Sequence, residues 1–158
     1  MSIKDNKYLI SKELDSINER EIAILDQENT DGSSWDYYCN GQIIQATVYN
    51  NRISGIIKEL ADEFHVEITA DENEISSNCS CGFKEGVCNH VVALLYSWVN
   101  DREDFVNIGT LVRRLHDKDK QELIEITERI FENNPGNVRF INPVENDETE
   151  IDNDFFDV

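Results

Sequence analysis

Three cysteines and one histidine stand close together in the chain, and all four side chains are metal ligands. Cys79, Cys81, Cys88 and His90 fall within twelve positions. Three thiolates and one imidazole form a ligand set that Zn²⁺ prefers in closed tetrahedral sites. We therefore predict one zinc ion per chain, bound by these four side chains.

The spacing of the ligands explains how the two pairs can converge. Cys79 and Cys81 are separated by one residue, and alternate side chains of an extended segment point to the same face. The six residues before Cys88 include Gly82 and Gly86, which give the connecting loop the freedom to turn back. Cys88 then begins an apolar helical pattern, where free backbone N–H groups and the helix dipole favour a thiolate.

The predicted centre has the composition of a structural site. Three thiolates, a neutral imidazole and Zn²⁺ sum to −1 and leave no open coordination position for water. The chain also lacks a glycine-rich phosphate-binding motif and a recognisable nucleophile with its base. We expect no catalytic residues and no enzymatic activity.

Alternating polarity before the cysteines predicts short strands that lead into the cluster. Residues 44–49 alternate, Asn50-Asn51 can form a hairpin turn, and residues 52–58 provide the returning strand. Residues 64–71 alternate strictly, and residues 75–77 begin a further strand. These segments predict a small antiparallel sheet that delivers the chain to Cys79.

Helical periodicity surrounds this sheet. We predict an N-terminal helix capped by Ser11 and running to about Glu28, followed by a turn at residues 29–34. From Val87 an apolar stripe predicts a helix that packs on the sheet. Two C-terminal helices follow, the second opened by a capping box of Asp119 and Glu122.

The predicted fold class is therefore α+β: a small antiparallel sheet leads into a zinc knuckle and helix, with one N-terminal helix and two further C-terminal helices. The predicted segments are 1–34 (helix and linker), 35–100 (zinc domain), 101–143 (helical extension) and 144–158 (acidic tail).

The pattern Cys-Xaa-Cys, a spacer and Cys-Xaa-His, preceded by strands and followed by Val91–Leu95, resembles the SWIM-type zinc finger. The resemblance covers about Trp35 to Trp98 and implies zinc-ligand roles for the four residues of the cluster. Such modules occur in chromatin-remodelling ATPases, transposases and partners of recombinase paralogues, and bind DNA or protein. Many members carry a basic residue at the middle position of the Cys-Xaa-His half of the motif, where this chain has Asn89.

The overall charge bears on the choice between those partners. The chain has 33 acidic and 14 basic residues, a net charge of −19, which repels polyphosphate at long range. We therefore expect a protein-interaction adaptor. The alternative is a nucleic-acid-binding accessory factor in DNA recombination, repair or transposition, because screening limits the reach of distant charges. Its candidate contacts are Arg113, Arg114, Lys118 and Lys120, which otherwise form an ordinary solvated face.

Other residue types have simpler interpretations. Cys39 is surplus to the ligand set and is predicted to be a packed thiol in or near a strand, while His65 and His116 are predicted to be structural. The aromatic residues Trp35, Tyr37 and Tyr38 are predicted to enter the sheet as core, with a base-stacking platform as the alternative.

The two ends of the chain carry further predictions. Residues 144–158 have seven acids and no base, so we expect disorder there, or an acidic-aromatic motif around Phe155-Phe156 that docks on a partner. No apolar stretch approaches the length of a membrane span, and Met1–Ile10 lacks a signal-peptide core. We expect a soluble cytoplasmic protein.

Overall fold

The computed structural model describes residues 6–8, 13–71, 75–83 and 86–141. The chain divides into two compact units, residues 1–112 and residues 113–158. The acidic tail, with Phe155 and Phe156, lies outside the described residues, as does Ser11. No helix among the described residues is long and apolar enough to cross a membrane.

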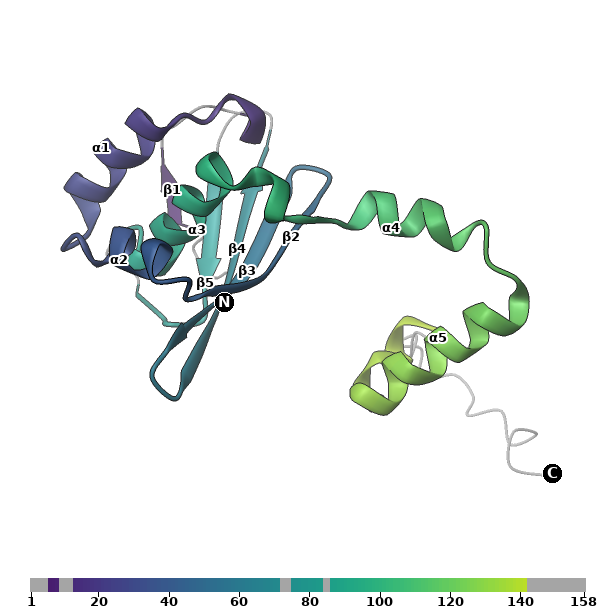
Figure 1. Ribbon diagram of the computed structural model, residues 1–158. Coiled ribbons are helices and arrows are strands. Elements are labelled where there is room, and N and C mark those ends of the chain that lie inside the picture. The colour runs from purple at the N-terminus through teal and green to yellow at the C-terminus, as the bar shows by residue number, and fades with distance from the viewer. Residues whose placement is uncertain (1–5, 9–12, 72–74, 84–85, 142–158) are drawn as a thin grey trace, which may run out of the picture. The chain divides into compact units, whose positions relative to one another are not determined.

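A six-stranded sheet forms the centre of the first unit, with the strand order β1-β5-β4-β3-β2-β6 (Figure 1). Strands β1 to β5 pair antiparallel, whereas the two-residue β6 pairs parallel to β2. The strand bounds are β1 Asn6–Tyr8, β2 Ile43–Tyr49, β3 Arg52–Glu59, β4 Asp62–Ala70, β5 Ile75–Cys79 and β6 Val106–Asn107. The predicted α+β class and the four predicted strands are confirmed. Strands β1 and β6 were not predicted, because segments of two or three residues carry no measurable alternation.

The turns between these strands follow from their residue types. Asn50 adopts a left-handed conformation with φ of 55°, which asparagine tolerates, and this residue turns β2 into β3. In β2 the register shifts between Ile44 and Thr47, where Gln45 has φ of 52°. Such a bulge increases the local twist of the strand.

Helix α1 (Glu19–Asn29) begins later than the sequence pattern predicted. Its N-cap is Asn18, whose side chain accepts from the Glu21 N–H at 3.0 Å, while the Glu21 carboxylate accepts from the Asn18 N–H at 3.3 Å. This capping box sets the helix start. The predicted continuous helix from Ser11 is therefore wrong: Leu14–Ser16 form a separate 3₁₀ turn, η1.

Helix α2 (Ser33–Cys39) replaces the predicted turn and aromatic entry into the sheet. The ring of Trp35 packs against Tyr38 and against Tyr96 of helix α3, with centroids 5.4 and 5.0 Å apart. The contact between Trp35 and Tyr96 joins residues that are 61 positions apart, and this tertiary contact, rather than local periodicity, favours the short helix. Cys39 ends α2 and is exposed, so its predicted place as a packed thiol in or near a strand is wrong.

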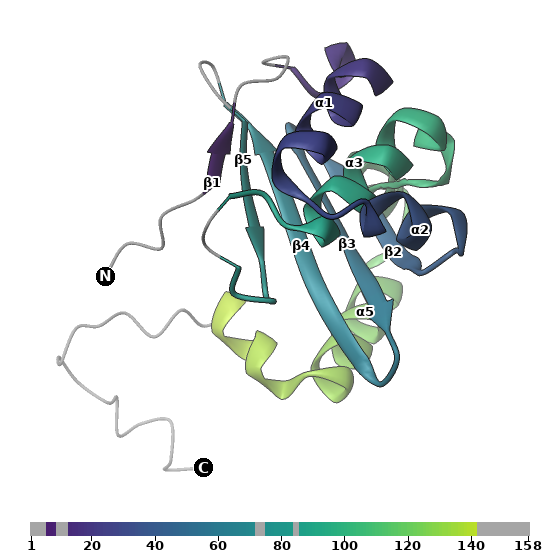
Figure 2. The same ribbon diagram turned by 90° about the vertical axis from the view of Figure 1, so that its left-hand side faces the viewer.

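Helix α3 (Asn89–Asn100) carries the apolar stripe predicted from Val87 onward. Helices α1, α2 and α3 all lie on the same side of the sheet (Figure 2). Gly55 of β3 permits close packing, because a Cβ built there would lie 2.9 Å from Leu94 Cδ1. The Tyr96 hydroxyl donates to Asp26 of α1 at 2.9 Å, which ties the outer helix to α3.

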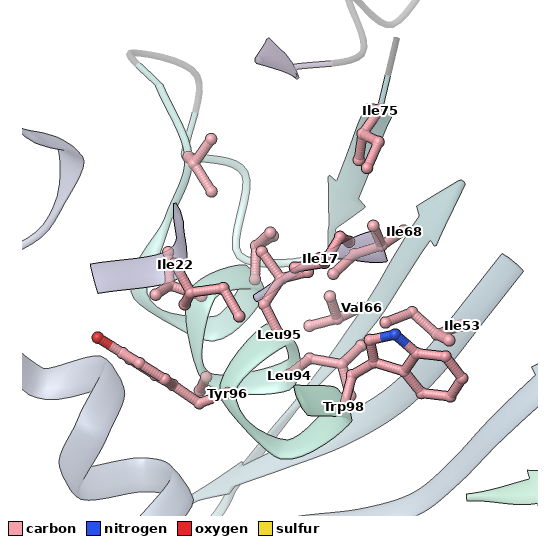
Figure 3. Close-up of a cluster of buried hydrophobic side chains, with 14 of the residues drawn as sticks. Ile17, Ile22, Ile53, Val66, Ile68, Ile75, Leu94, Leu95, Tyr96 and Trp98 are labelled. Atoms are coloured by element: carbon pink, nitrogen blue, oxygen red, sulfur yellow. The ribbon is translucent and has the colours of Figure 1, made fainter. Parts of the chain in front are cut away.

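The core lies between α3 and the sheet. Figure 3 shows Leu94 and Leu95 of α3 gathered with Val66 and Ile68 of β4. All four side chains are at most 1% exposed. Trp98 closes the cluster, and its Nε1–H donates to the backbone oxygen of Leu14 at 2.9 Å. The core therefore holds α3, and with it the residues at its N-terminus, in one position on the sheet.

The remaining helices are α4 (Ile108–Leu115), which spans the boundary between the units, and α5 (Lys120–Asn133). Short 3₁₀ segments occupy Arg102–Asp104 (η2) and Pro135–Phe140 (η3). The predicted capping box of α5 is present, with Asp119 accepting from the Glu122 N–H at 2.8 Å. No residue of α4, α5 or η3 is buried.

Candidate metal centre

The four predicted ligands converge at the junction between the sheet and α3. Cys79 is the last residue of β5, Cys81 lies in the following turn, Cys88 is the N-cap of α3, and His90 is in its first turn. Their ligand atoms all lie within 4.8 Å of one another. Cys88 and His90 are buried, and each is 8% exposed.

The arrangement fits a tetrahedral metal ion. Zinc bonds of about 2.3 Å to sulfur and about 2.0 Å to nitrogen place tetrahedral ligand atoms about 3.6–3.8 Å apart. The Cys79 Sγ and His90 Nδ1 atoms are already 3.7 Å apart. Bringing the widest pair to the same separation requires a shift of about 1 Å, within the range of side-chain rotation. The donor set, with three soft sulfurs and one imidazole, suits zinc.

The turn after β5 holds the first cysteine pair. Gly82 has φ of 75°, a left-handed conformation that side chains rarely adopt, and its N–H donates to the Cys79 oxygen at 3.3 Å. Ser80, between the two cysteines, forms two hydrogen bonds with His65 of β4. Its N–H donates to the His65 oxygen at 3.0 Å, and its hydroxyl accepts from the His65 N–H at 2.9 Å. The hydrogen bonds at the end of the β4–β5 pair therefore position both sulfurs.

The electrostatics of the cluster favour one ionised thiolate. Hydrogen bonding from Cys79 lowers the pKa of Cys88 to about 4 despite its burial, with the Val91 N–H at the start of α3 contributing. The same hydrogen bond is the largest cause that raises the pKa of Cys79, and burial is the second largest. Burial lowers the pKa of His90, but its hydrogen bonds to Cys88, Cys81 and Glu59 outweigh burial and raise that pKa to about 9. A thiol or an imidazolium must lose its proton before it binds a metal, so metal binding at this cluster would release protons.

His90 is surrounded by residues that the sequence did not single out together. Its Nε2 lies 3.3 Å from Glu59 Oε2 at the end of β3. Phe64 of β4 stacks on the imidazole, with centroids 4.3 Å apart and planes at 21°, and Tyr37 of α2 lies 5.5 Å away. Burial, and then the hydrogen bond to Glu59, raise the pKa of Tyr37 to about 12.

Asn89, between the candidate ligands Cys88 and His90, hydrogen-bonds the segment that precedes β2. Its Nδ2 donates to Asp31 Oδ1 at 3.0 Å, and its Oδ1 accepts from the Ser34 hydroxyl at 3.1 Å. Ser34 is fully buried. The position that is basic in many SWIM-type fingers therefore joins α2 to the metal centre in this protein.

A cleft of about 770 Å³ opens beside the ligands. Its walls include Cys81, Cys88 and His90 together with Asp31, Glu59 and the half-exposed Phe83. Charged and polar groups therefore border the cluster on its open side.

Comparison with known families agrees with this geometry. The model of the SWIM zinc finger matches residues 64–98. The matched segment begins in β4, includes all four ligands and ends within α3, so the resemblance is confirmed over the sheet-to-helix junction. No curated protein and no solved structure matches the chain.

The four basic residues predicted as nucleic-acid contacts lie outside this SWIM segment. Arg113 and Arg114 are in the last turn of α4, Lys118 is in the following turn, and Lys120 begins α5. All four are exposed. His65 and His116 are exposed as well.

The aromatic residues of α2 have separate places. Trp35 and Tyr38 contact the ring of Tyr96, whereas Tyr37 faces His90. Sequence reasoning missed Glu59, Tyr37 and Asn89 as neighbours of the metal centre. Only Asn89 carried a local signal, its place between two ligands.

Proposed function

We propose that Cys79, Cys81, Cys88 and His90 bind one structural zinc ion that joins β5 to α3. The convergence of three sulfurs and one ring nitrogen supports this proposal, as does the match to a zinc-finger family. Four protein ligands fill a tetrahedral shell and leave no site for a reactive water, so we also propose that the protein is not an enzyme. Reduced cysteines as ligands favour a cytoplasmic location.

Elemental analysis of the purified protein tests the site, and thermal melts before and after chelation test its role. We expect one zinc per chain and a large fall in melting temperature on chelation. Absence of zinc, or its loss without a change in melting temperature, contradicts the proposal. Turnover of a substrate that chelation abolishes and zinc restores, without refolding, contradicts the non-enzymatic role.

We further propose that the finger is part of a protein-interaction adaptor whose docking elements are α4 and α5. The supporting observation is the apolar surface of these helices. Leu111 and Val112 of α4 are 44% and 40% exposed, and Ile130 of α5 is 47% exposed. An amphipathic helix without a core of its own typically lays its apolar side in a partner's groove.

Substitution of single apolar positions in the full chain tests this adaptor role. The measurement is cross-linking to, and co-purification of, a protein that the wild-type chain binds. Leu111→Asp and Ile130→Asp should each abolish both without lowering zinc content. Leu60→Asp is the matched control, because Leu60 is fully exposed on a turn of the first unit. Equal retention of the partner by all three variants contradicts the proposal.

Nucleic-acid binding is the second candidate. Its support is the exposure of Arg113, Arg114, Lys118 and Lys120 within an otherwise acidic chain. Fluorescence anisotropy with duplex and single-stranded DNA at several salt concentrations tests it. Affinity that falls steeply with salt and is lost on Arg114→Glu supports this role, since phosphate contacts release counterions. A flat salt dependence or no binding contradicts it.

A further inference from the structure

We infer that Glu59 and Tyr37 are positioning residues for the metal centre: the Glu59 carboxylate accepts a hydrogen bond from His90 Nε2–H and thereby directs Nδ1 toward the cysteines. This inference rests on the proposed zinc binding. It assigns a role to two residues that lie 31 and 53 positions before the histidine, outside the segment that matches the SWIM finger.

The two nitrogens of the imidazole face different partners. Nδ1 lies 3.7 Å from Cys79 Sγ, on the side of the ligand cluster. Nε2 lies 3.3 Å from Glu59 Oε2. A neutral imidazole binds a metal through the nitrogen that lacks a proton, so its other nitrogen must carry one. In this geometry the proton belongs on Nε2.

Burial makes the Glu59 acceptor important. The His90 side chain is only 10% exposed, so an Nε2–H without a partner would lose most of its contact with water. The Glu59 side chain is 41% exposed, so it keeps contact with water while it faces the histidine. A carboxylate in this position fixes the tautomer and raises the basicity of the ligating nitrogen.

Tyr37 extends the contact to α2. Its ring lies 5.5 Å from the imidazole, and Tyr37, Glu59 and His90 line the same cleft. After burial, the Glu59 carboxylate is the next cause that raises the pKa of the Tyr37 hydroxyl. Phe64 stacks on the imidazole with centroids 4.3 Å apart. The histidine is therefore held by groups from α2, β3 and β4. Placement of α2 on the finger then contributes to the geometry of the metal ligand.

A positioning role makes a different prediction from a simple ion pair. An ion pair between Glu59 and a protonated His90 would stabilise the fold alone and would be lost once the imidazole binds a metal. A positioning hydrogen bond persists in the zinc-bound protein and increases the affinity for zinc.

Zinc affinity, measured by competition with a chromophoric chelator, is the first test. Glu59→Ala should weaken binding by about 10–100-fold, the usual effect of removing such an outer contact. Glu59→Gln keeps an acceptor oxygen and should recover part of this loss. Tyr37→Phe should weaken binding by less than about 10-fold. Glu67→Ala is the control, because this β4 carboxylate is exposed and contacts Arg52, 3.6 Å away; we expect wild-type affinity.

A spectroscopic readout separates positioning from general loss of stability. Long-range ¹H–¹⁵N spectra of the zinc-loaded protein should show a proton on His90 Nε2 that exchanges slowly in the wild type and rapidly in Glu59→Ala. If Glu59→Ala does not fold, Glu59→Gln and Tyr37→Phe provide the same comparison.

The outcomes are distinguishable. Wild-type affinity in Glu59→Ala, or a zinc-bound protein that carries its His90 proton on Nδ1, overturns this inference and leaves zinc binding intact. A wild-type protein that binds no zinc overturns the proposed function, and this inference with it.

Discussion

The two units of the chain use apolar side chains in opposite ways. Among the described residues, the 20 buried apolar residues all lie between Leu14 and Phe105, in the first unit. From Arg113 to Ile141, the described part of the second unit, no residue is buried, and Ile130, Val138 and Phe140 are 47–72% exposed. One unit buries its apolar surface internally, and the other presents it to solvent.

This difference separates two sources of stability. In the first unit, α3 is held by the sheet on one side and by α1 and α2 on another, so a metal ion would join parts that already share a core. In the second unit, α5 begins with a capping box but has no buried residue. Capping alone stabilises a helix only modestly, and binding of the proposed partner would add the apolar packing that stabilises most helices.

The largest expected effect comes from removing a metal ligand. Cys88→Ser should abolish zinc binding and lower the melting temperature of the first unit by roughly 10–20 °C, because the binding free energy of a structural zinc contributes to folding. Elemental analysis and calorimetry measure both effects.

Cys39→Ser is the matched control for Cys88→Ser. Cys39 is exposed at the end of α2 and is not one of the four clustered residues, so we expect unchanged zinc content and melting temperature. Equal losses in both variants would contradict the ligand assignment.

A core substitution should distinguish the two kinds of helix next. Leu94→Ala removes a fully buried side chain of α3 and should lower the free energy of unfolding by about 2–5 kcal/mol. Leu111→Ala in α4 removes a side chain that is 44% exposed and should cost less than about 0.5 kcal/mol. Urea denaturation of the two variants gives both values; similar losses would mean that α4 is buried in solution.

Asn89→Ala tests the contact between the metal centre and α2. It removes the acceptor of the fully buried Ser34 hydroxyl and a donor to Asp31, so we expect a loss of about 1–3 kcal/mol in stability with zinc content unchanged. Asn78→Ala, at an exposed position of β5, should have little effect. Similar stability of the two variants would show that the Asn89 contacts contribute nothing.

The smallest expected effects compare the same motif in both units. Asn18→Ala removes the N-cap of α1 and should lower global stability by about 0.5–2 kcal/mol, because Ile22 and Leu25 of α1 belong to the core. Asp119→Ala removes the N-cap of α5 and should speed amide exchange in that helix without changing the melting temperature of the first unit. A lower melting temperature of the first unit in Asp119→Ala would show that the two units are coupled.

Local features of the chain predicted much of this structure. The alternation at residues 64–70 predicted β4, and the stripe through Val91, Leu94 and Trp98 predicted α3. Each of these elements has one buried and one less buried side, so its period is visible in the sequence. The start of α1 was missed because Leu14 and Ile17 have a spacing that also fits a helix. In the structure they fill the core from the separate turn η1 and from the residue after it.

Ligand types and spacing along the chain were enough to identify the metal cluster, since its four members lie within twelve positions and a turn with Gly82 brings them together. The surroundings of that cluster depended on tertiary structure. Glu59 and Tyr37 lie beside His90, and Asn89 bonds Ser34. These neighbours come together only because α2 packs on α3 and β3 ends beside both helices. Hydrogen bonds between residues that are 31 and 55 positions apart have no periodic signature. These hydrogen bonds form because packing in the folded core brings the residues together. The same packing favours a helix, α2, for the aromatic residues.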